Sequence, residues 1–269
     1  MVDDAAKQAA AFLSETGRKP CLATVLVGED PGSVTYVRMK QNRCAQAGMT
    51  SRHVPLPTQT TTAELVHVIS GLSRDPDVDG ILLQHPVPAQ IDERAAFEAI
   101  SPEKDVDGVT MYSFAAMAFS QPGFASCTPF GIMRLLDAYG VDPRGKHAVV
   151  VGRSPILGKP VGMLLLAQDA TVTYCHSRTQ QLAVIVGTAD IVVAAVGKPE
   201  FVRGAWLKKG AVVLDAGYNE GNVGDVAFDE AIKRAGMITP VPGGVGPMTI
   251  AVLLEQTVQA ALRLHARPA

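Results

Sequence analysis

The stretch that decides the fold is VVVGRSPILG, residues 149–158 of a chain of 269 residues. Three valines lead into Gly152, and Gly158 follows six residues later, just before a helix predicted over residues 160–168. A β-branched run, a turn with glycine and a helix form the first step of a parallel sheet whose strands are connected by helices. Glycine lets backbone N–H groups approach a phosphate, and the helix N-terminus favours its negative charge. A dinucleotide site is therefore expected here, at Gly152, Arg153, Ser154 and Gly158.

The spacing of this turn is unusual, because Ser154 stands where the pattern G-x-G-x-x-G has its second glycine. On its own the turn fits an ordinary strand-to-helix connection equally well. The next strand adds a second signal, since Ser177 and Arg178 follow it and no acidic residue stands at its end. Proteins that bind NAD usually place Asp or Glu there for the ribose 2′-hydroxyl, whereas Ser and Arg suit a 2′-phosphate. With Arg153 in the turn, the sequence predicts NADP, and solvated surface arginines are the alternative.

Short apolar runs alternate with helical patterns along the chain, which predicts an α/β protein with parallel sheets. We expect two α/β domains flanking a cleft, with a boundary near residues 121–123. Residues 1–121 form a catalytic domain, onto which a helix at 249–269 packs back, and residues 122–248 form a Rossmann-like domain with a parallel sheet. Strands are expected at 22–27, 53–57, 80–84, 147–151, 170–174, 191–196, 211–215 and 237–239.

Two further strand ends carry small residues. Val196 and Gly197 stand at the end of one strand, and Gly217 follows the next. Open α/β sheets bind ligands outside the carboxyl ends of their strands, so we assign these three residues to the cofactor site. Plain turn chemistry explains them equally well.

The stretch PGGVGPMT, residues 242–249, holds three glycines between two prolines and runs directly into a helix. Such a stretch brings bare backbone against a ligand at a helix N-terminus. Turn chemistry rarely needs so many glycines with prolines on both sides, so we interpret it as a ligand loop. The residues assigned to substrate binding are Gly243, Gly244, Pro247 and Thr249.

A second site is expected around Lys40, on the first helix after the first strand, with Ser33 as the predicted N-cap. Tyr36 and Lys40 are four residues apart and share a helix face, although most such pairs are solvated. Gln84 ends an apolar strand, and Asp107 lies in a charged loop. A lysine held against a glutamine and removed from water loses its proton more readily and can exchange protons with a substrate. Asp107 suits a heterocycle rich in donors, or a capped turn.

Composition and charge exclude several classes of protein. Hydrophobic residues make up 47% and the formal net charge is −2, so a folded core is expected and neither nucleic acid nor a membrane is an expected partner. The cysteines form no C-x-x-C pair and the histidines are scattered, which predicts free thiols and no metal site. The N-terminus lacks a signal-peptide pattern, so we expect a cytoplasmic protein. The cysteines are Cys21, Cys44, Cys127 and Cys175.

Five motifs occur together and in order: YVRMK at 36–40, GILLQHP at 80–86, PEKDVDG at 102–108, GRS at 152–154 with GKP at 158–160, and PGGVGPMT at 242–249. With these motifs the chain resembles, over nearly its whole length, the bifunctional methylenetetrahydrofolate dehydrogenase/methenyltetrahydrofolate cyclohydrolase family. The resemblance implies that 5,10-methylenetetrahydrofolate gives a hydride to NADP, and that water then opens the methenyl cation to 10-formyltetrahydrofolate. It also implies a homodimer formed through the cofactor domain.

The resemblance implies roles for single residues. Lys40 would be the catalytic lysine that transfers protons in the hydrolysis, and Gln84 would hold and tune it. Tyr36 would cover the folate, and Asp107 would bond the pterin ring. Folate and nicotinamide would be bordered by Gly243, Gly244, Pro247 and Thr249, and the cofactor would be held by Arg153, Ser154, Ser177 and Arg178.

Two residues depart from the family pattern, since His85 stands where an aliphatic residue is common and Tyr218 replaces a smaller one. Alternatives are a dehydrogenase without the hydrolytic activity and a catalytically silent module that binds NADP or folate. Lys40, Gln84 and Asp107 disfavour the silent module. Short-chain dehydrogenases also use Tyr-x-x-x-Lys, but there the dinucleotide turn precedes this pair, whereas here it follows it.

Overall fold

The computed structural model of the protein describes residues 1–266, so residues 267–269 of the predicted C-terminal helix lie outside the described part. The chain forms two compact units, each with its own parallel sheet. The predicted fold class of two α/β units is therefore confirmed. The first unit combines Met1–Ala116 and Pro122–Ala125 with the stretch that begins at Ile250, and the second consists of Met117–Gln121 and Ser126–Thr249.

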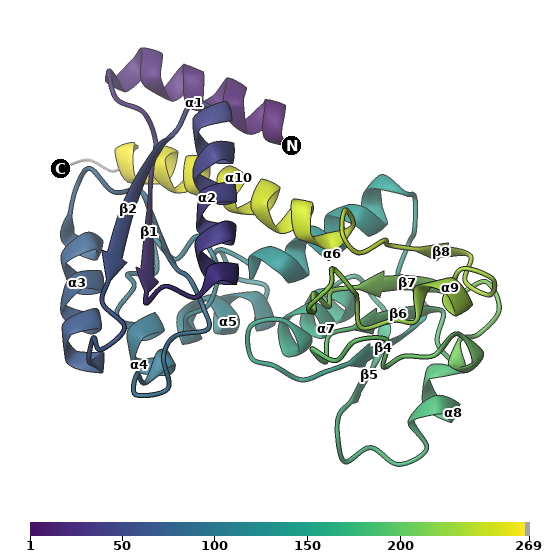
Figure 1. Cartoon of the computed structure of the whole chain (residues 1–269). Helices are drawn as coiled ribbons and strands as arrows, with labels where there is room; N and C mark the ends of the chain where they lie inside the picture. Colours follow the sequence, from purple (N-terminus) through teal and green to yellow (C-terminus); the bar gives the residue numbers. More distant parts are fainter. Residues whose placement is uncertain (267–269) are drawn as a thin grey trace. The chain divides into compact units, whose positions relative to one another are not determined.

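In the first unit, β1 (Cys21–Val27) lies between β2 (Thr50–Leu56) and β3 (Gly80–Leu83), and all three strands are parallel. The helices α2 (Pro31–Gln46) and α3 (Thr62–Arg74) lie on opposite sides of this sheet (Figure 1). This follows from right-handed connections, because the chain moves outward from β1 to β2 and then back past β1 to β3. All seven residues of β1 are buried, as expected for a central strand with both faces covered.

The helix that carries Lys40 begins earlier than predicted. Asp30 is its N-cap, and its carboxylate accepts the backbone N–H of Ser33 at 2.8 Å. Pro31 takes the first helical position, where its missing N–H has no intrahelical partner to lose. The prediction of Ser33 as N-cap is therefore wrong, because an aspartate followed by proline fits the start of a helix better than the serine three residues later.

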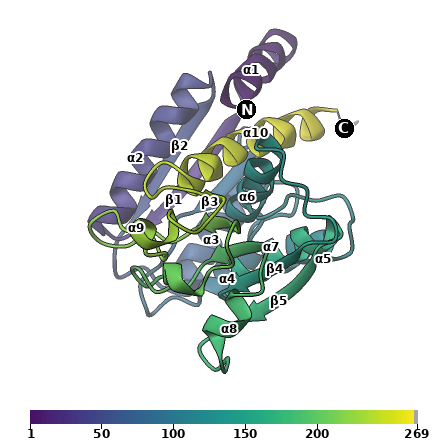
Figure 2. The same cartoon turned by 90° about the vertical axis from the view of Figure 1, so that its right-hand side faces the viewer.

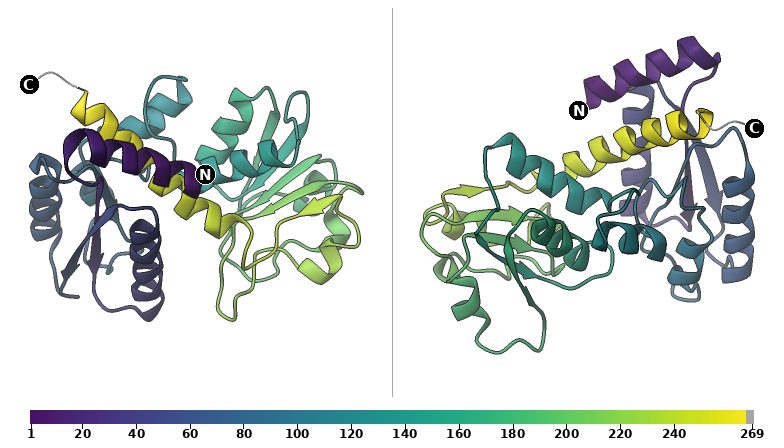
Figure 3. Two further views of the ribbon diagram at one scale, coloured as in Figure 1. Left: turned by 90° about the horizontal axis from the view of Figure 1, so that it is seen from above. Right: turned by 180° about the vertical axis from the view of Figure 1, so that it is seen from behind.

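One long and apolar helix contributes its residues from Ile250 onward to the first unit. By length and composition α10 (Val245–His265) could cross a membrane, but 61% of its most apolar window is buried, as in a core helix. From Ile250 onward it packs beside α1 (Val2–Thr16), as Figure 2 and Figure 3 show, and the rings of Phe12 and His265 are 5.8 Å apart. The shorter helices are α4 (Glu93–Glu98) and α5 (Met111–Ala118).

The second unit has a parallel sheet in the order β5-β4-β6-β7-β8. The chain moves from β4 to β5 on one side and then returns to β6 on the other side of β4. The carboxyl ends of β4 and β6 therefore form a switch point, where open α/β sheets bind ligands. The strands are β4 (His147–Val151), β5 (Thr171–Cys175), β6 (Ile191–Ala194), β7 (Val212–Asp215) and β8 (Met237–Ile238). The helices are α6 (Cys127–Ala138), α7 (Gly158–Ala167), α8 (Leu182–Val186), the 3-10 helix η1 (Gly204–Trp206) and α9 (Phe228–Ala231).

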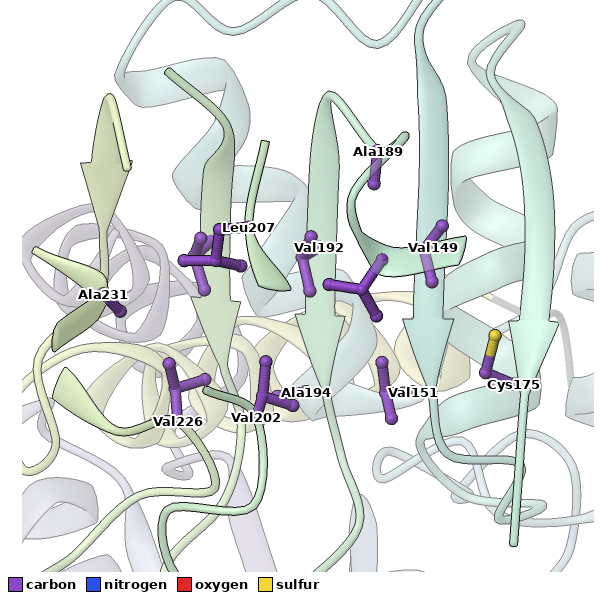
Figure 4. Close-up of a cluster of buried hydrophobic side chains, with 12 residues drawn as sticks. Val149, Val151, Cys175, Ala189, Val192, Ala194, Val202, Leu207, Val226 and Ala231 are labelled. Carbon is purple, nitrogen blue, oxygen red and sulfur yellow. The ribbon is translucent and has the colours of Figure 1, made fainter. Parts of the chain in front are cut away.

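The valine run that predicted this unit is buried on both faces of the sheet. Val149 and Val151 pack with Val192 in a cluster on one face (Figure 4). Val150 points to the other face and packs with Ile132 of α6. Because successive strand residues face opposite ways, a strand covered on both sides must be apolar at every position.

Candidate functional site

Two elements of the first unit bring Lys40 and Gln84 together. Lys40 lies near the middle of α2, and Gln84 follows directly after β3. The Nζ of Lys40 donates to Oε1 of Gln84 at 3.0 Å. Gln84 is 8% exposed, and its Nε2 donates to the carbonyl of His85 at 2.8 Å, just before the cis peptide bond between His85 and Pro86. Both ends of the amide are engaged, which orients its oxygen toward the lysine.

Tyr36 lies one helical turn before Lys40, and both side chains are half-buried. Residues four apart on a helix are neighbours, so the two contribute to one face of α2. Met39, which is adjacent to Lys40 in the sequence, is 46% exposed. The half-buried pair thus differs from the solvated pair that this spacing usually represents.

Asp107 lies half-buried in a turn that Asp105 organises. Asp105 is fully buried, and its carboxylate accepts the backbone N–H groups of Val109 and Thr110 at 3.0 and 2.9 Å and the hydroxyl of Ser113 at 2.6 Å. The sequence left two interpretations of this loop open, ligand binding and turn capping. The contacts of Asp105 are those of a residue that caps a turn. The same contacts fix the start of α5, a helix that the sequence analysis missed. The signal for it is Thr110, whose Oγ1 accepts the N–H of Ser113 at 3.1 Å as an N-cap does.

The two departures from the family pattern occupy different units. His85 is half-buried, and its ring packs edge-on against Phe97 with the ring centroids 6.3 Å apart. Tyr218 is 53% exposed, and its hydroxyl donates to Oδ1 of Asn222 at 2.5 Å. His85 also supplies the carbonyl that orients Gln84, a contact that any residue at this position provides through its backbone.

Close backbone approaches shape the turn between β4 and α7. Gly152 has φ +137°, and a Cβ on it would lie 2.2 Å from the carbonyl oxygen of Ala195. A Cβ on Gly158 would lie 2.7 Å from the carbonyl carbon of Gly152. Both positions therefore require glycine. Ser154, which takes the place of the usual second glycine, accepts the N–H of Gly158 on its Oγ at 3.1 Å and so satisfies one of the first N–H groups of α7.

The turns after β4 and β5 carry exposed polar and basic side chains. Arg153 follows β4, and Ser177 and Arg178 follow β5; all three are exposed. The turn after β5 is held by His176, whose Nδ1 accepts the N–H of Arg178 at 3.2 Å, and by Thr179, whose Oγ1 accepts the N–H of His176 at 2.8 Å. Since β4 and β5 are adjacent and parallel, both turns lie at the same edge of the sheet.

The turns after β6 and β7 surround Asp225, a residue for which the sequence predicted no role. These turns contain Val196, Gly197 and Gly217. Asp225 is fully buried, and its carboxylate accepts the N–H groups of Val196, Gly197 and Lys198 at 2.6, 2.9 and 2.9 Å. A Cβ on Gly217 would lie 2.3 Å from Asp225 Oδ1. Asp225 is separated from this turn by 27 to 29 residues, so no local motif marks it.

The stretch 242–249 enters its helix sooner than predicted. α10 begins at Val245, so Pro247 and Thr249 lie inside its first turns. Proline is tolerated there because the first N–H groups of a helix have no intrahelical partner. The hydroxyls of Thr249 and Thr128 are 3.0 Å apart, which links this helix start to α6.

The two adjacent glycines of this stretch have opposite surroundings. Gly243 has φ +103°, and no atom lies within 4 Å of a Cβ built on it. A Cβ on Gly244 would lie 2.5 Å from the carbonyl oxygen of Pro240. Packing therefore excludes a side chain at Gly244, whereas backbone conformation disfavours one at Gly243 and leaves the space beside it open.

The second unit fits a dinucleotide that carries a 2′-phosphate. The turns at the carboxyl edge combine two exposed guanidinium groups with a helix N-terminus, and β5 ends without a carboxylate. Gly197 has φ +63° and no atom within 4 Å of a Cβ built on it, so a ligand can reach this backbone. Among residues 1–266, no group of three or more His, Cys, Asp or Glu side chains is placed to hold a metal ion.

Two family models match the chain. Residues 1–107 match the catalytic domain of tetrahydrofolate dehydrogenase/cyclohydrolase. Residues 126–265 match the NAD(P)-binding domain of tetrahydrofolate dehydrogenase/cyclohydrolase.

Known proteins resemble the chain over almost its full length. It is 72% identical to the bifunctional protein FolD 1 of Streptomyces avermitilis, covering 97% of this chain and 91% of that protein. Among solved structures, the methylenetetrahydrofolate dehydrogenase-cyclohydrolase of Trypanosoma brucei, complexed with NADP cofactor and inhibitor, has a TM-score of 0.95 and 38% identity, covering 99% and 95% of the two chains. The bifunctional enzyme FolD of Campylobacter jejuni has a TM-score of 0.94 and 40% identity, covering 97% and 94%.

Proposed function

The chain belongs to the tetrahydrofolate dehydrogenase/cyclohydrolase family, and from this premise we propose a site for its two reactions, with Lys40 as the group that moves protons. The enzyme oxidises 5,10-methylenetetrahydrofolate with NADP and hydrolyses the methenyl product to 10-formyltetrahydrofolate. The contact between Lys40 Nζ and Gln84 Oε1 is the observation that supports the assignment of Lys40.

Lys40 serves the hydrolytic reaction. Water adds to the carbon of the methenyl cation and must lose a proton, and opening of the ring then requires a proton on the departing nitrogen. An amine near this carbon can accept the first proton and return one to the nitrogen. Gln84 is a positioning residue, because its buried amide offers an acceptor to the lysine without adding a negative charge.

The folate ring system is held by the other side chains of the first unit, and the stretch 242–249 of the second unit is assigned separately as a ligand loop. Tyr36, on the same face of α2 as Lys40, covers the folate, and the carboxylate of Asp107 accepts hydrogen bonds from the pterin. The open backbone at Gly243 supports a close approach of a ligand to this stretch. The further residues assigned to folate are Gly244, Pro247 and Thr249.

NADP, when bound, supplies the hydride acceptor for the first reaction. Hydride transfer needs alignment of two bound molecules and no acid or base from the protein, so the second unit acts by holding and orienting. Arg153 and Ser177 bind the 2′-phosphate, with Arg178 beside them. The backbone that borders the rest of the cofactor belongs to Gly152, Ser154, Gly158, Val196, Gly197 and Gly217.

The experiment that tests this assignment is Lys40→Met. Methionine keeps much of the length of lysine and removes the titrating group, so hydrolysis of methenyltetrahydrofolate should fall by about 10²–10⁴-fold. Binding of NADP should stay unchanged. The matched control is Lys7→Met, on an exposed lysine of α1 whose side chain is 81% exposed. Full hydrolysis by Lys40→Met would disprove the proton-transfer role.

The domain bounds and the oligomeric state are also proposed from the family to which the chain belongs. Residues 1–121 with the C-terminal helix form the folate domain and residues 122–248 the NADP domain, and two chains pair through the NADP domain. The edge strand β8, where Met237 is 44% exposed, supports a pairing surface there. A monomer by light scattering at assay concentrations would disprove the homodimer.

We expect the enzyme to be located in the cytoplasm. We expect it to bind folates, and to bind neither nucleic acid nor a membrane. The four cysteines are buried and form no disulfide, which suits a reducing compartment. Recovery of the enzyme in the membrane fraction of its cells would contradict this location.

A further inference from the structure

Asp225 has more hydrogen-bond donors around it than a turn requires. Its Oδ2 accepts the N–H groups of Val196 and Gly197, and its Oδ1 accepts the N–H of Lys198 and, at 3.1 Å, Nδ2 of Asn219. A carboxylate offers about four acceptor positions, and here four donors use them. The side chain is fully buried and lies beside β6, whose carboxyl end borders the switch point of the sheet.

The surroundings of Asp225 are built for this close approach. Gly217 leaves room for its carboxylate, since a Cβ there would lie 2.3 Å from Oδ1. A second buried acid, Asp215, accepts the backbone N–H groups of Asp225 and Val226, both at 2.9 Å. Gly224 leaves room for Asp215 in turn, because a Cβ there would lie 2.0 Å from Asp215 Oδ2. Two carboxylates thus tie together the turns that follow β6 and β7.

The contacts determine which polar groups the turn offers to a ligand. Three consecutive N–H groups, from Val196 to Lys198, point at Asp225, so the carbonyl oxygens are the backbone groups left for the opposite direction. Gly197, at the centre, is exposed and has φ +63°. The turn therefore presents acceptors, which suit a ligand with N–H donors such as the carboxamide of a nicotinamide.

We propose that Asp225 is a positioning residue for the dehydrogenase reaction, which holds the turn Val196–Lys198 in the conformation that receives the nicotinamide half of the cofactor. The inference rests on the proposed function, in which Val196 and Gly197 border NADP. It adds to that function a residue that acts through these two and does not touch the cofactor.

The variant that tests the inference is Asp225→Asn, which keeps the shape of the side chain and turns one acceptor oxygen into a donor. At least one N–H of the turn then faces an NH₂ group and must move. The KM for NADP should rise about tenfold or more, as for loss of a charge-assisted hydrogen bond. The rate of methenyltetrahydrofolate hydrolysis, measured without cofactor, should stay within twofold of the wild type. The matched control is Asp229→Asn, on an exposed acid of α9 in the same unit.

Each outcome decides between the two proposals. An unchanged KM for NADP would overturn the positioning role, and so would an equal fall of both activities, because general damage to the fold affects both. If the wild-type protein oxidises no methylenetetrahydrofolate, the proposed function fails instead. Should Asp225→Asn not fold, Asn219→Ala takes its place, since it removes one donor and leaves the carboxylate. It should raise the KM for NADP at least threefold, and an unchanged KM would again overturn the inference.

Discussion

Replacing Gln84 by glutamate changes one charge beside Lys40 at almost constant shape. The Oε1 of Gln84 lies 3.0 Å from Lys40 Nζ, and the side chain is 8% exposed. Gln84→Glu would put a carboxylate oxygen in the same place. A carboxylate favours the ammonium over the neutral amine, so the variant raises the pKa of Lys40 and depletes the form that accepts a proton.

The distance sets the size of the effect. Coulomb's law for unit charges at 3.0 Å gives about 1.4 kcal/mol in water and about 5.5 kcal/mol at an effective dielectric constant of about 20. Lys40 is half-buried, so the lower part of this range applies, about 1.4 to 3 kcal/mol. About 1.36 kcal/mol is a factor of ten, so the neutral fraction of the amine falls about 10- to 100-fold. Hydrolysis should fall by the same factor near neutral pH and recover part of its rate as the pH is raised.

The assay follows the absorbance of the methenyl chromophore between pH 6.5 and 8.5, without NADP. The control is Gln46→Glu, which adds the same charge near the exposed end of α2, where Gln46 accepts a hydrogen bond from Arg43 at 3.0 Å. That variant should keep the wild-type pH profile. A Gln84→Glu enzyme with an unchanged rate, or with a reduced rate that does not rise as the pH is raised, would refute the reasoning that Lys40 moves protons in its neutral form.

Three further predictions concern the cofactor and stability. Arg153→Ala should raise the KM for NADP about tenfold and the KM for NAD much less, as for loss of a bond to a charged group, and equal rises would mean that Arg153 does not bind the 2′-phosphate. Asp79→Ala should lower the free energy of unfolding by about 1–3 kcal/mol in denaturant titrations, because it leaves the buried backbone N–H of Cys21 without its acceptor and removes the partner of the part-exposed Arg18; a loss below about 0.5 kcal/mol would contradict this. A hydrogen bond from Lys208 at 2.6 Å lowers the pKa of Asp190, so its contribution to stability is present above the unfolded pKa and lost as the pH falls through the folded one. Wild-type stability should therefore fall more on acidification than that of Asp190→Asn, and parallel curves would disprove the coupling.

Much of the fold could be predicted because local patterns dictate it. The valines of β4 are needed on both faces of a covered strand, so their pattern is visible without knowing their neighbours. Gly152 could be found in the same way, since the turn it serves is adjacent in sequence. The N-cap of α2 could not be predicted from Ser33 alone, because Asp30 is a second candidate for the same role. The proline that follows Asp30 favours a helix that begins there.

The site was predictable where a residue type itself carries the chemistry. A lysine and a glutamine suggested proton transfer before their contact was known, and they lie 3.0 Å apart across 44 positions. Asp225 gave no such signal, since its role depends on four donors from two distant turns. The same holds for Asp105, which lies in the same charged loop as Asp107 and differs from it by complete burial.

These differences follow from what the two reactions demand. Hydrolysis needs a group that titrates, so in the proposed assignment its machinery concentrates in Lys40, and loss of that one nitrogen should remove most of the rate. Hydride transfer needs alignment, which we propose is shared by glycines, turns and a buried carboxylate, each of which contributes part. Substitutions around β6 and β7 should therefore weaken oxidation by degrees and leave hydrolysis in place, because Asp225 lies in the second unit and Lys40 in the first.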